Sequence, residues 1–420
     1  MLTKVDNEYL TRTDPGTPMG AFVRRFWFPA MLSDELPEPD GAPLRVKLLG
    51  ESLVAFRDSN GDVGMIQNNC PHRGASLFFG RNEEAGLRCV YHGWKFDVTG
   101  RCVDMPNEPA ESDFKDKVRA QVYPCVDRGG VIWIYMGPPE LKGEVPGLEW
   151  AMVPPEQRHL TKRLQQSNYL QAVEGGIDSS HISFLHSSLK NLRGGISDFV
   201  ASDKHPHFEV LETDYGLLVG ARRDAGPSEY YWRVSQFLVP FFQMIPAQRG
   251  GPVSGHVWVP IDDENCWAWS MSWHPSRPLT DQEVANYRSG NGIHATVDAR
   301  YRPLANKDND YLIDRGLQRT ETYTGIRGIG EQDMACQESM GAIFDREHER
   351  LGASDTAIIG MRRQLLRMAR QLEAGVEPEM AKAPGVYHVR STSFVIKRDE
   401  SWVEHTLADM PTPTRLLRPA

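Results

Sequence analysis

The chain has 420 residues, of which 40% are hydrophobic and 25% charged, a composition typical of a globular protein with a large core. Its 47 basic and 56 acidic residues give a net charge of −9, which argues against nucleic-acid binding, since nucleic-acid binders usually present a basic surface. No apolar run is long enough to span a bilayer, and the N-terminus lacks the apolar core of a signal peptide, so we expect a cytoplasmic protein of two or three domains.

The predicted elements change character along the chain. Residues 1–21 are polar and turn-rich, and we expect an N-terminal arm. Residues 22–140 alternate short β-type runs with Gly, Pro and Asp, the pattern of a small all-β domain. Residues 141–384 combine long aromatic strands with helical stretches, which is typical of an antiparallel sheet with helices, the last of them at the C-terminal end. Residues 385–420 carry several prolines and predict an ill-defined tail, so the expected fold class is α+β.

Two short motifs of the first domain each combine a cysteine with a histidine. Cys70-Pro-His72 and Cys89-Val-Tyr-His92 each place one thiolate and one imidazole on a tight loop. Two such loops facing each other can hold a [2Fe–2S] cluster with two Cys ligands on one iron and two His ligands on the other, which is a Rieske centre. A zinc site is the alternative, but its usual spacing pairs the cysteines first and the histidines after them. The spacing therefore favours a Rieske cluster.

A second candidate metal site follows in the second domain. His181 and His186, with a carboxylate from elsewhere, would form a 2-His-1-carboxylate triad, which leaves positions open for dioxygen on non-haem Fe(II). On a regular helix a separation of five residues puts two side chains about 140° apart. We therefore expect a distortion or a helix end between them. Alone this signal is weak, because histidines without a metal are common.

The order of these motifs resembles a known family. The stretches that carry the resemblance are NNCPHRGASLFFGRNEEAGLRCVYHGWKFD, LQAVEGGIDSSHISFLHSSL, VPIDDENCWAWSMSWHP and QDMACQESMG. They are similar to the oxygenase α subunit of Rieske non-haem iron aromatic ring-hydroxylating oxygenases, in particular the phthalate-dioxygenase-like branch. The resemblance runs from Phe22 to Gly352 and implies a Rieske domain over residues 22–140 and a catalytic mononuclear iron domain over residues 141–384.

The resemblance also implies the metal ligands. It assigns one [2Fe–2S] cluster per chain to Cys70, His72, Cys89 and His92. It assigns one mononuclear Fe(II) per chain to His181, His186 and Asp333. The choice of Asp333 rests on the resemblance alone, because the residues themselves leave other carboxylates open. These are Glu331, Glu338 and Asp345.

Asp178 has a separate, catalytic role in the family resembled. Its counterpart is not a ligand but lies between subunits, where it orients two imidazoles and couples the metal centres. Here its partners would be His181 and the His92 of a neighbouring subunit. The alternative is that Asp178 only N-caps the helix that carries His181, a common place for Asp.

The resemblance further implies the partners. These are O2, an aromatic small-molecule substrate and a separate flavin and iron–sulfur reductase that draws on NADH or NADPH, either directly or through a ferredoxin. Electrons must come from outside because the chain has no dinucleotide or flavin fingerprint of its own. A head-to-tail homotrimer or a hexamer is also implied.

We expect the substrate pocket above the iron, lined by apolar and aromatic side chains. The candidates are Ser179, Ile182, His207, Val234 and Met244, with Phe237, Phe241 and Phe242 as residues that could equally belong to the core. His207 and Met244 stand where the phthalate-type pattern predicts arginines that clamp two carboxylates. Phthalate is therefore disfavoured against a monocarboxylate, a larger biaryl acid or a methoxylated aromatic acid. Four arginines remain nearby without an assigned face, namely Arg222, Arg223, Arg233 and Arg249.

The predicted function is that of a terminal oxygenase in aromatic compound catabolism. It would oxidise a carboxylated aromatic substrate by ring dihydroxylation or by monooxygenation with O-demethylation, which use the same cofactors. Two alternatives stay open. A Rieske-type electron-transfer protein without oxygenase activity would hold two irons per chain instead of three. A zinc-dependent hydrolase or structural zinc protein would be colourless and free of acid-labile sulfide.

Overall fold

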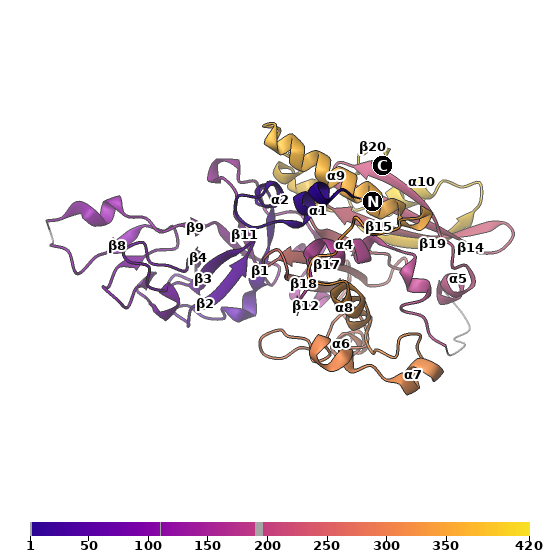
Figure 1. The fold of residues 1–420 in the computed structure, drawn as a ribbon, viewed down its shortest axis with the longest axis horizontal. Coiled ribbons are helices and arrows are strands. Elements are labelled where there is room, and N and C mark those ends of the chain that lie inside the picture. The colour runs from indigo at the N-terminus through magenta and orange to yellow at the C-terminus, as the bar shows by residue number, and fades with distance from the viewer. Residues whose placement is uncertain (1, 110, 190–195) are drawn as a thin grey trace. The chain divides into compact units, whose positions relative to one another are not determined.

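The computed structural model describes residues 2–109, 111–189 and 196–420, which form two compact units (Figure 1). The small unit is Thr13–Val145, and the large unit combines Pro146–Ala420 with the N-terminal segment up to Arg12. The predicted arm of residues 1–21 is therefore divided between the two units instead of standing apart. Among the described residues, no helix combines the length and the apolar character needed to cross a membrane.

The small unit consists of three antiparallel sheets, as its short β-type runs predict. One sheet has the order β1-β11-β10, the second β2-β3-β4-β9 and the third β5-β6-β7-β8. Its core gathers apolar side chains from the second and third sheets, among them Phe56, Ile66, Leu87 and Phe96. The strands are β1 (Trp27–Leu32), β2 (Leu44–Leu48), β3 (Glu51–Arg57), β4 (Val63–Gln67), β5 (Arg81–Glu83), β6 (Gly86–Arg88), β7 (Lys95–Phe96), β8 (Cys102–Asp104), β9 (Val122–Tyr123), β10 (Cys125–Arg128) and β11 (Val131–Tyr135).

The large unit is organised around a nine-stranded antiparallel sheet. Its order is β12-β18-β17-β16-β15-β14-β13-β20, and β19 pairs with β15 beside this path. The predicted α+β class is confirmed. The strands are β12 (Arg158–Gln165), β13 (His207–Thr213), β14 (Gly216–Asp224), β15 (Glu229–Leu238), β16 (Phe242–Ile245), β17 (Val253–Pro260), β18 (Cys266–Trp273), β19 (Thr392–Lys397) and β20 (Leu416–Pro419).

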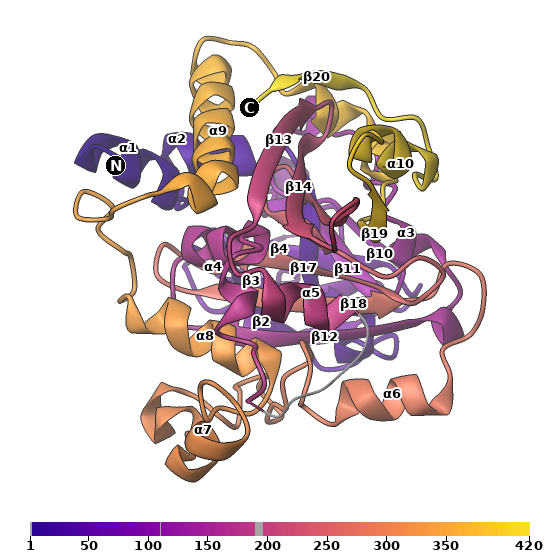
Figure 2. The ribbon, with the colours of Figure 1, turned by 90° about the vertical axis from the view of Figure 1, so that its right-hand side faces the viewer.

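Helices cover this sheet and carry the candidate iron site. Helix α4 is capped at its N-terminus by Asn168, whose side chain accepts the Leu170 N–H, and it packs on β16, β17 and α8. Figure 2 shows the long amphipathic α9 beside β13 and β14, which it contacts with its apolar side. The helices are α1 (Lys4–Thr11), α2 (Pro18–Val23), α3 (Glu149–Met152), α4 (Tyr169–Ile177), α5 (Ile196–Ser202), α6 (Asp281–Arg288), α7 (Arg315–Thr320), α8 (Ile329–Ser339), α9 (Thr356–Glu373) and α10 (Trp402–Ala408).

The C-terminal segment differs from the ill-defined tail predicted for residues 385–420. It adds β19 to β15 and β20 to β13, with α10 between them. Trp402 of α10 stacks on Trp232 of β15 with 5.0 Å between ring centroids. The proline-rich sequence did not predict these elements, because the segment gains its structure from burying aromatic surface on a distant sheet and not from local periodicity.

Candidate metal centres and substrate cavity

The two Cys–His motifs of the small unit form matching turns. In each, the cysteine N–H donates to the carbonyl five residues on, at 2.8 Å. Gly74 and Gly93 donate back to the carbonyls of Cys70 and Cys89, at 2.9 and 3.0 Å. Both glycines have positive φ, 76° and 80°, which a residue with a Cβ adopts only with strain. At Gly93 a Cβ would also lie 2.6 Å from Cγ of Pro106.

The four candidate cluster ligands divide into a buried pair and a more accessible pair. Cys70 and Cys89 are buried, and burial, together with the neighbouring Cys89, raises the pKa of the Cys70 thiol to about 11. The rings of His72 and His92 lie 4.4 Å apart, and Trp94 stacks on His72 at 4.2 Å. Two buried sulfurs with two adjacent imidazoles fit the donor set of a Rieske cluster, which would hold the sulfurs as thiolates.

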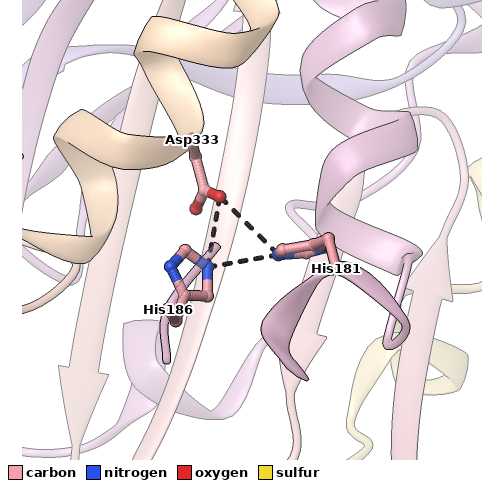
Figure 3. Close-up of side chains that lie close together, drawn as sticks. All are labelled: His181, His186 and Asp333. Atoms are coloured by element: carbon pink, nitrogen blue, oxygen red, sulfur yellow. Dashed lines mark hydrogen bonds and ion pairs between the residues drawn. The ribbon is translucent and has the colours of Figure 1, made fainter. Parts of the chain in front are cut away.

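His181, His186 and Asp333 converge in the large unit (Figure 3). The Nε2 atoms of the two histidines lie 3.1 Å apart. Oδ1 of Asp333, on α8, lies 3.2 Å from Nε2 of His186 and 3.6 Å from Nε2 of His181. Two imidazole nitrogens and one carboxylate oxygen facing one point are the donor set of a non-haem Fe(II) site, so the residues fit this metal.

The expected break between the two histidines is confirmed. Helix α4 ends at Ile177, and a short 3₁₀ helix, His181–Ser183, follows it. Phe184 then leaves helical geometry with φ −122° and ψ −65°. This break lets side chains five residues apart point to one place, which a continuous α-helix would prevent.

Asp178 supports His181 in two ways. Its Oδ1 accepts the Ser180 N–H at 2.6 Å and its Oδ2 the His181 N–H at 3.3 Å, so it caps the turn that carries the histidine. The same Oδ2 lies 3.2 Å from Nδ1 of the His181 ring. The cap and the ring contact, which the sequence presented as alternatives, therefore coexist in one side chain. Contact with a neighbouring subunit remains a prediction.

Gln332 supports His186, and sequence reasoning missed it. Its Oε1 lies 2.7 Å from Nδ1 of His186, and its Nε2 donates to the carbonyl of Ile326 at 2.8 Å. This second bond determines which end of the amide faces the histidine. The Nδ1 atoms of both histidines are thus engaged, which leaves both Nε2 atoms toward Asp333. The sequence offered one signal for this role, because Gln332 directly precedes the proposed ligand Asp333.

Burial and charge act in opposite directions on this site. Burial alone lowers the pKa of His181, but the Asp178 hydrogen bond and the charges of Asp333 and Asp178 outweigh it, so the pKa is raised. Burial alone raises the pKa of Asp333, but the contact with His186 and the two imidazoles outweighs it, so the pKa is lowered. The carboxylate is therefore stabilised in the ionised form that binds a metal.

The other three candidate carboxylates point elsewhere. Glu338 accepts from the Gln166 N–H and the Tyr311 hydroxyl, at 2.7 and 2.6 Å. Asp345 is exposed, and Glu331 is a buried carboxyl outside the triad. Of the four, Asp333 is the one that the described part of the chain brings within 4.8 Å of both histidines.

A cavity of about 150 Å³ opens beside the triad. Ser179 and Ile182 line it, as predicted. The other three substrate candidates do not: His207 is exposed at the start of β13, Val234 belongs to a core cluster under α10, and Met244 is buried away from the cavity. The phenylalanines 237, 241 and 242 are fully buried core residues.

The register of two strands explains why Val234 and Met244 do not line the cavity. Arg233 and Ser235 of β15 line the cavity, whereas Val234 between them points to the opposite face. On β16, Gln243 and Ile245 line the cavity and the intervening residue, Met244, does not. Because side chains alternate along a strand, a shift of one residue moves a prediction to the wrong face.

Two arginines line the cavity, a question that the sequence left open. They are Arg233 and Arg163, the second of which sequence reasoning missed. The other candidates serve different contacts. Arg222 lies over the Tyr230 ring, and Arg249 pairs with Asp409. Arg223 is buried and donates to the Ser179 carbonyl at 2.6 Å.

A second, larger cavity of about 580 Å³ also borders the triad. Asp178, His181 and Asp333 line both cavities. The remaining wall of the larger cavity is mostly apolar, with Phe184 and Met340 among its lining residues. The candidate iron site therefore borders both cavities within the large unit.

Comparison with known proteins agrees with this geometry. Residues 26–124 match the Rieske [2Fe-2S] domain, and residues 134–414, more than half of the chain, match the LigXa C-terminal domain like family. The 3-chlorobenzoate-3,4-dioxygenase oxygenase subunit of Comamonas testosteroni is 39% identical over 96% of each chain. The chain belongs to the family of Rieske ring-hydroxylating oxygenase α subunits.

Other relatives of this Rieske oxygenase differ in the reaction that they are named for. The phthalate 4,5-dioxygenase oxygenase subunit of Pseudomonas putida is 38% identical over 96% of this chain and 95% of its own. The 5,5'-dehydrodivanillate O-demethylase oxygenase subunit of Sphingobium sp. is 31% identical over 90% and 83%. The predicted family and enzyme class, a terminal oxygenase with a Rieske [2Fe–2S] cluster, are confirmed.

The solved structures extend the likeness to the fold of this Rieske oxygenase. Dicamba monooxygenase bound to dicamba superposes with a TM-score of 0.60 at 20% identity, over 85% of this chain and all of that one. At this identity the likeness supports the architecture alone.

Proposed function

We propose that this Rieske oxygenase binds mononuclear iron(II) at His181, His186 and Asp333 and oxidises a carboxylated aromatic substrate in the adjoining cavity. The observation that carries the proposal is the convergence of two Nε2 atoms and one carboxylate oxygen, 3.1–3.6 Å apart, at the wall of a cavity that two arginines also line. When bound, iron in such a triad supplies sites at which dioxygen and electrons meet.

The residues around the triad hold it in place. Asp178 and Gln332 each engage one Nδ1 atom, so neither ring can rotate its Nε2 away without losing a hydrogen bond. Apolar side chains of Ile182, Ile245 and Trp258 line the cavity and exclude water from the space beside the triad. The substrate is thereby positioned by the shape of the cavity and by the positive charge of its arginine lining.

The cluster supplies the second redox centre. We assign its ligation to Cys70, His72, Cys89 and His92, supported by their matching turns. Electrons reach it from a separate flavin and iron–sulfur reductase, since the similar proteins are named as oxygenase subunits of larger systems. Asp178 then couples the His181 side to a neighbouring cluster in a homotrimer or hexamer, a role that its ring contact supports.

Ring dihydroxylation is the favoured outcome. The two relatives with 38–39% identity are named dioxygenases, against 31% for the O-demethylase. The O-demethylase remains the second candidate because the same triad and cavity serve both reactions. Product mass separates them: dihydroxylation adds two oxygens and two hydrogens, whereas O-demethylation removes a CH₂ unit and releases formaldehyde.

Metal content tests the proposed iron site. We expect three irons and two acid-labile sulfides per wild-type chain, and two irons with an unchanged cluster spectrum in Asp333→Ala. Asp345→Ala, an exposed carboxylate outside the triad, is the matched control and should keep three. Two irons in the wild type would support an electron-transfer protein, and zinc without sulfide would support a hydrolase.

A single-turnover assay tests the reaction. Chemically reduced protein meets O2 and a pool of benzoates, phthalates and methoxybenzoates, with products identified by mass spectrometry. We expect a dihydrodiol from wild type and none from Asp333→Ala. A wild-type protein with three irons that oxidises none of these acids would contradict the proposed substrate class.

A further inference from the structure

Arg233 has an unsatisfied guanidinium at the substrate cavity. The side chain projects from β15, lines the 150 Å³ cavity, and holds its Nε buried without a hydrogen-bond partner. Within the described residues the guanidinium has neither an ion pair nor a hydrogen-bond acceptor. Arginine keeps its charge in proteins, so a positive group faces the cavity without a counter-charge of its own.

The neighbouring arginines are bound to the protein itself. Arg223 donates to the carbonyls of Ser179 and Asp203, at 2.6 and 3.1 Å. Arg163 donates, over longer distances, to the carbonyls of Ile293 and Gly330, both at 3.4 Å. These contacts give the two side chains structural roles, although Nε of Arg163 and one terminal nitrogen of Arg223 are also buried without a hydrogen-bond partner. Arg233 has no such role, which leaves its five N–H donors for a ligand.

The chemistry of the missing partner follows from this donor group. A partly buried, unpaired charge is unfavourable unless an opposite charge meets it. The planar fork of a guanidinium matches a carboxylate, which it binds through two parallel hydrogen bonds. The ligand at Arg233 is therefore an anion, and a carboxylate fits the donor geometry.

Charge also determines which end of such a ligand approaches the triad. Asp178 and Asp333 line the same cavity, and neither forms an ion pair with Arg233. An incoming carboxylate is attracted to Arg233 and repelled by the carboxylate of Asp178, whereas the charge of Asp333 would be offset by the iron(II) that it would bind. The uncharged ring is thus directed to the space beside the histidines.

Size limits the ring system. The walls include Ile182, Ile245, Trp258 and Ile293, so the space between the charged ends is apolar. A cavity of about 150 Å³ accommodates one benzene ring. A second ring exceeds this volume and would have to extend into the larger cavity, which shares Asp178, His181 and Asp333 with this one.

We propose that Arg233 is the specificity-determining residue of this enzyme and binds the carboxylate of a one-ring aromatic monoacid. This inference rests on the proposed function, since it places the ring beside the proposed iron site. It deepens that function by naming the residue that selects the acid and by favouring one-ring acids over biaryl acids.

Calorimetric binding to the full-length protein with its metal centres tests the proposal at pH 7.5. The probes are benzoate, its neutral analogue benzamide, and biphenyl-4-carboxylate. We expect wild type to bind benzoate more tightly than benzamide, and Arg233→Gln to weaken benzoate by roughly 10- to 100-fold with benzamide unchanged, the range for a charge-assisted hydrogen bond. Arg233→Lys, which keeps the charge without the fork, should fall between them.

The matched control is Arg222→Gln, because Arg222 lies on the neighbouring strand over Tyr230 and outside the cavity. It should leave the affinity for benzoate unchanged. The assignment would be overturned if Arg233→Gln bound benzoate within twofold of the wild-type affinity. It would also be overturned if the wild type did not prefer benzoate over benzamide. Biphenyl-4-carboxylate bound as tightly as benzoate would overturn the one-ring limit. The iron content of the same samples distinguishes failure of this inference from failure of the proposed function. Three irons per chain without binding of the acid would refute the role of Arg233 alone. Two irons per chain would refute the proposed function.

Discussion

At the scale of single residues, two buried histidines lie at the sheet of the large unit: His256 lines the cavity, and His294 contacts β12 and β18. His294 lies between two hydroxyls, with Thr161 Oγ1 2.8 Å from its Nδ1 and Ser272 Oγ 2.9 Å from its Nε2. Burial, with the neighbouring His159 and His256, lowers the pKa of His294 to about 2. Burial and the charge of Arg163 lower the pKa of His256 to about 4. Both rings are therefore neutral in the folded protein.

These histidines predict a loss of stability in mild acid. The unfolded chain takes up a proton at each histidine as the pH falls through about 6.5, whereas the folded chain does not until the pH is far lower. The contribution of these two histidines to the unfolding free energy is therefore fully present above pH 6.5. It declines below that pH, by roughly 1.4 kcal/mol per pH unit for each histidine. Urea unfolding midpoints between pH 7.5 and 5.5 measure this decline.

His294→Gln supplies the control. Glutamine keeps a donor and an acceptor for the two hydroxyls but does not titrate. The decline with pH should therefore become shallower in this variant. An equally steep decline would show that other groups cause it.

At the scale of elements, a buried ionic cluster anchors α4, which leads directly into Asp178. Glu174 of α4 binds Arg346 through two bonds of 3.0 and 2.9 Å and Arg362 of α9 at 2.7 Å. Burial opposes ionisation of Glu174, but the two guanidiniums outweigh it and the pKa of Glu174 is lowered. The triad thus depends on an ion cluster that contacts neither histidine.

Removing this carboxylate should destabilise the large unit strongly. Glu174→Gln leaves the buried guanidinium of Arg346 without its counter-charge, whereas Arg362 keeps its pair with Glu349. The expected cost is roughly 3–5 kcal/mol in unfolding free energy. Glu347→Gln, at an exposed position in the same region, should change it by less than about 0.5 kcal/mol. Urea denaturation followed by tryptophan fluorescence measures both. Equal effects in the two variants would refute the role assigned to the cluster.

At the scale of the whole molecule, both ends of the chain complete the large unit. Near the N-terminus, the carbonyls of Leu10 and Thr11 accept hydrogen bonds from Tyr169 and Asn168, each at 2.8 Å, at the start of α4. Near the C-terminus, β19, α10 and β20 cover and extend the sheet. Residues hundreds of positions apart therefore share one core.

Trp402 is the residue through which the C-terminal segment should contribute most. It is buried against Trp232, and its Nε1 donates to Oε2 of Glu209 at 2.7 Å. Trp402→Ala should cost about 3–5 kcal/mol in unfolding free energy, and Trp402→Phe, which keeps a ring, clearly less. Equilibrium unfolding in urea checks both values. A cost below about 1 kcal/mol for the alanine variant would mean that the segment is dispensable to the fold.

The sequence by itself determined the features that depend on nearby residues. The Cys70 and Cys89 turns close through hydrogen bonds to residues four and five positions away, so the motif and its glycines suffice to predict them. The break between His181 and His186 follows from helix geometry. The α+β class follows from the strand and helix patterns, and the family from the motifs.

Only the tertiary structure decided the features that join distant segments. It brought Asp333 and Gln332 to His186, nearly 150 positions earlier, where the residues alone left four carboxylates open. It also decided which face of β15 meets the cavity, placing Arg233 there instead of Val234. The physical reason is that strand alternation defines two faces, but only packing against other elements determines which face is buried and which one lines a site.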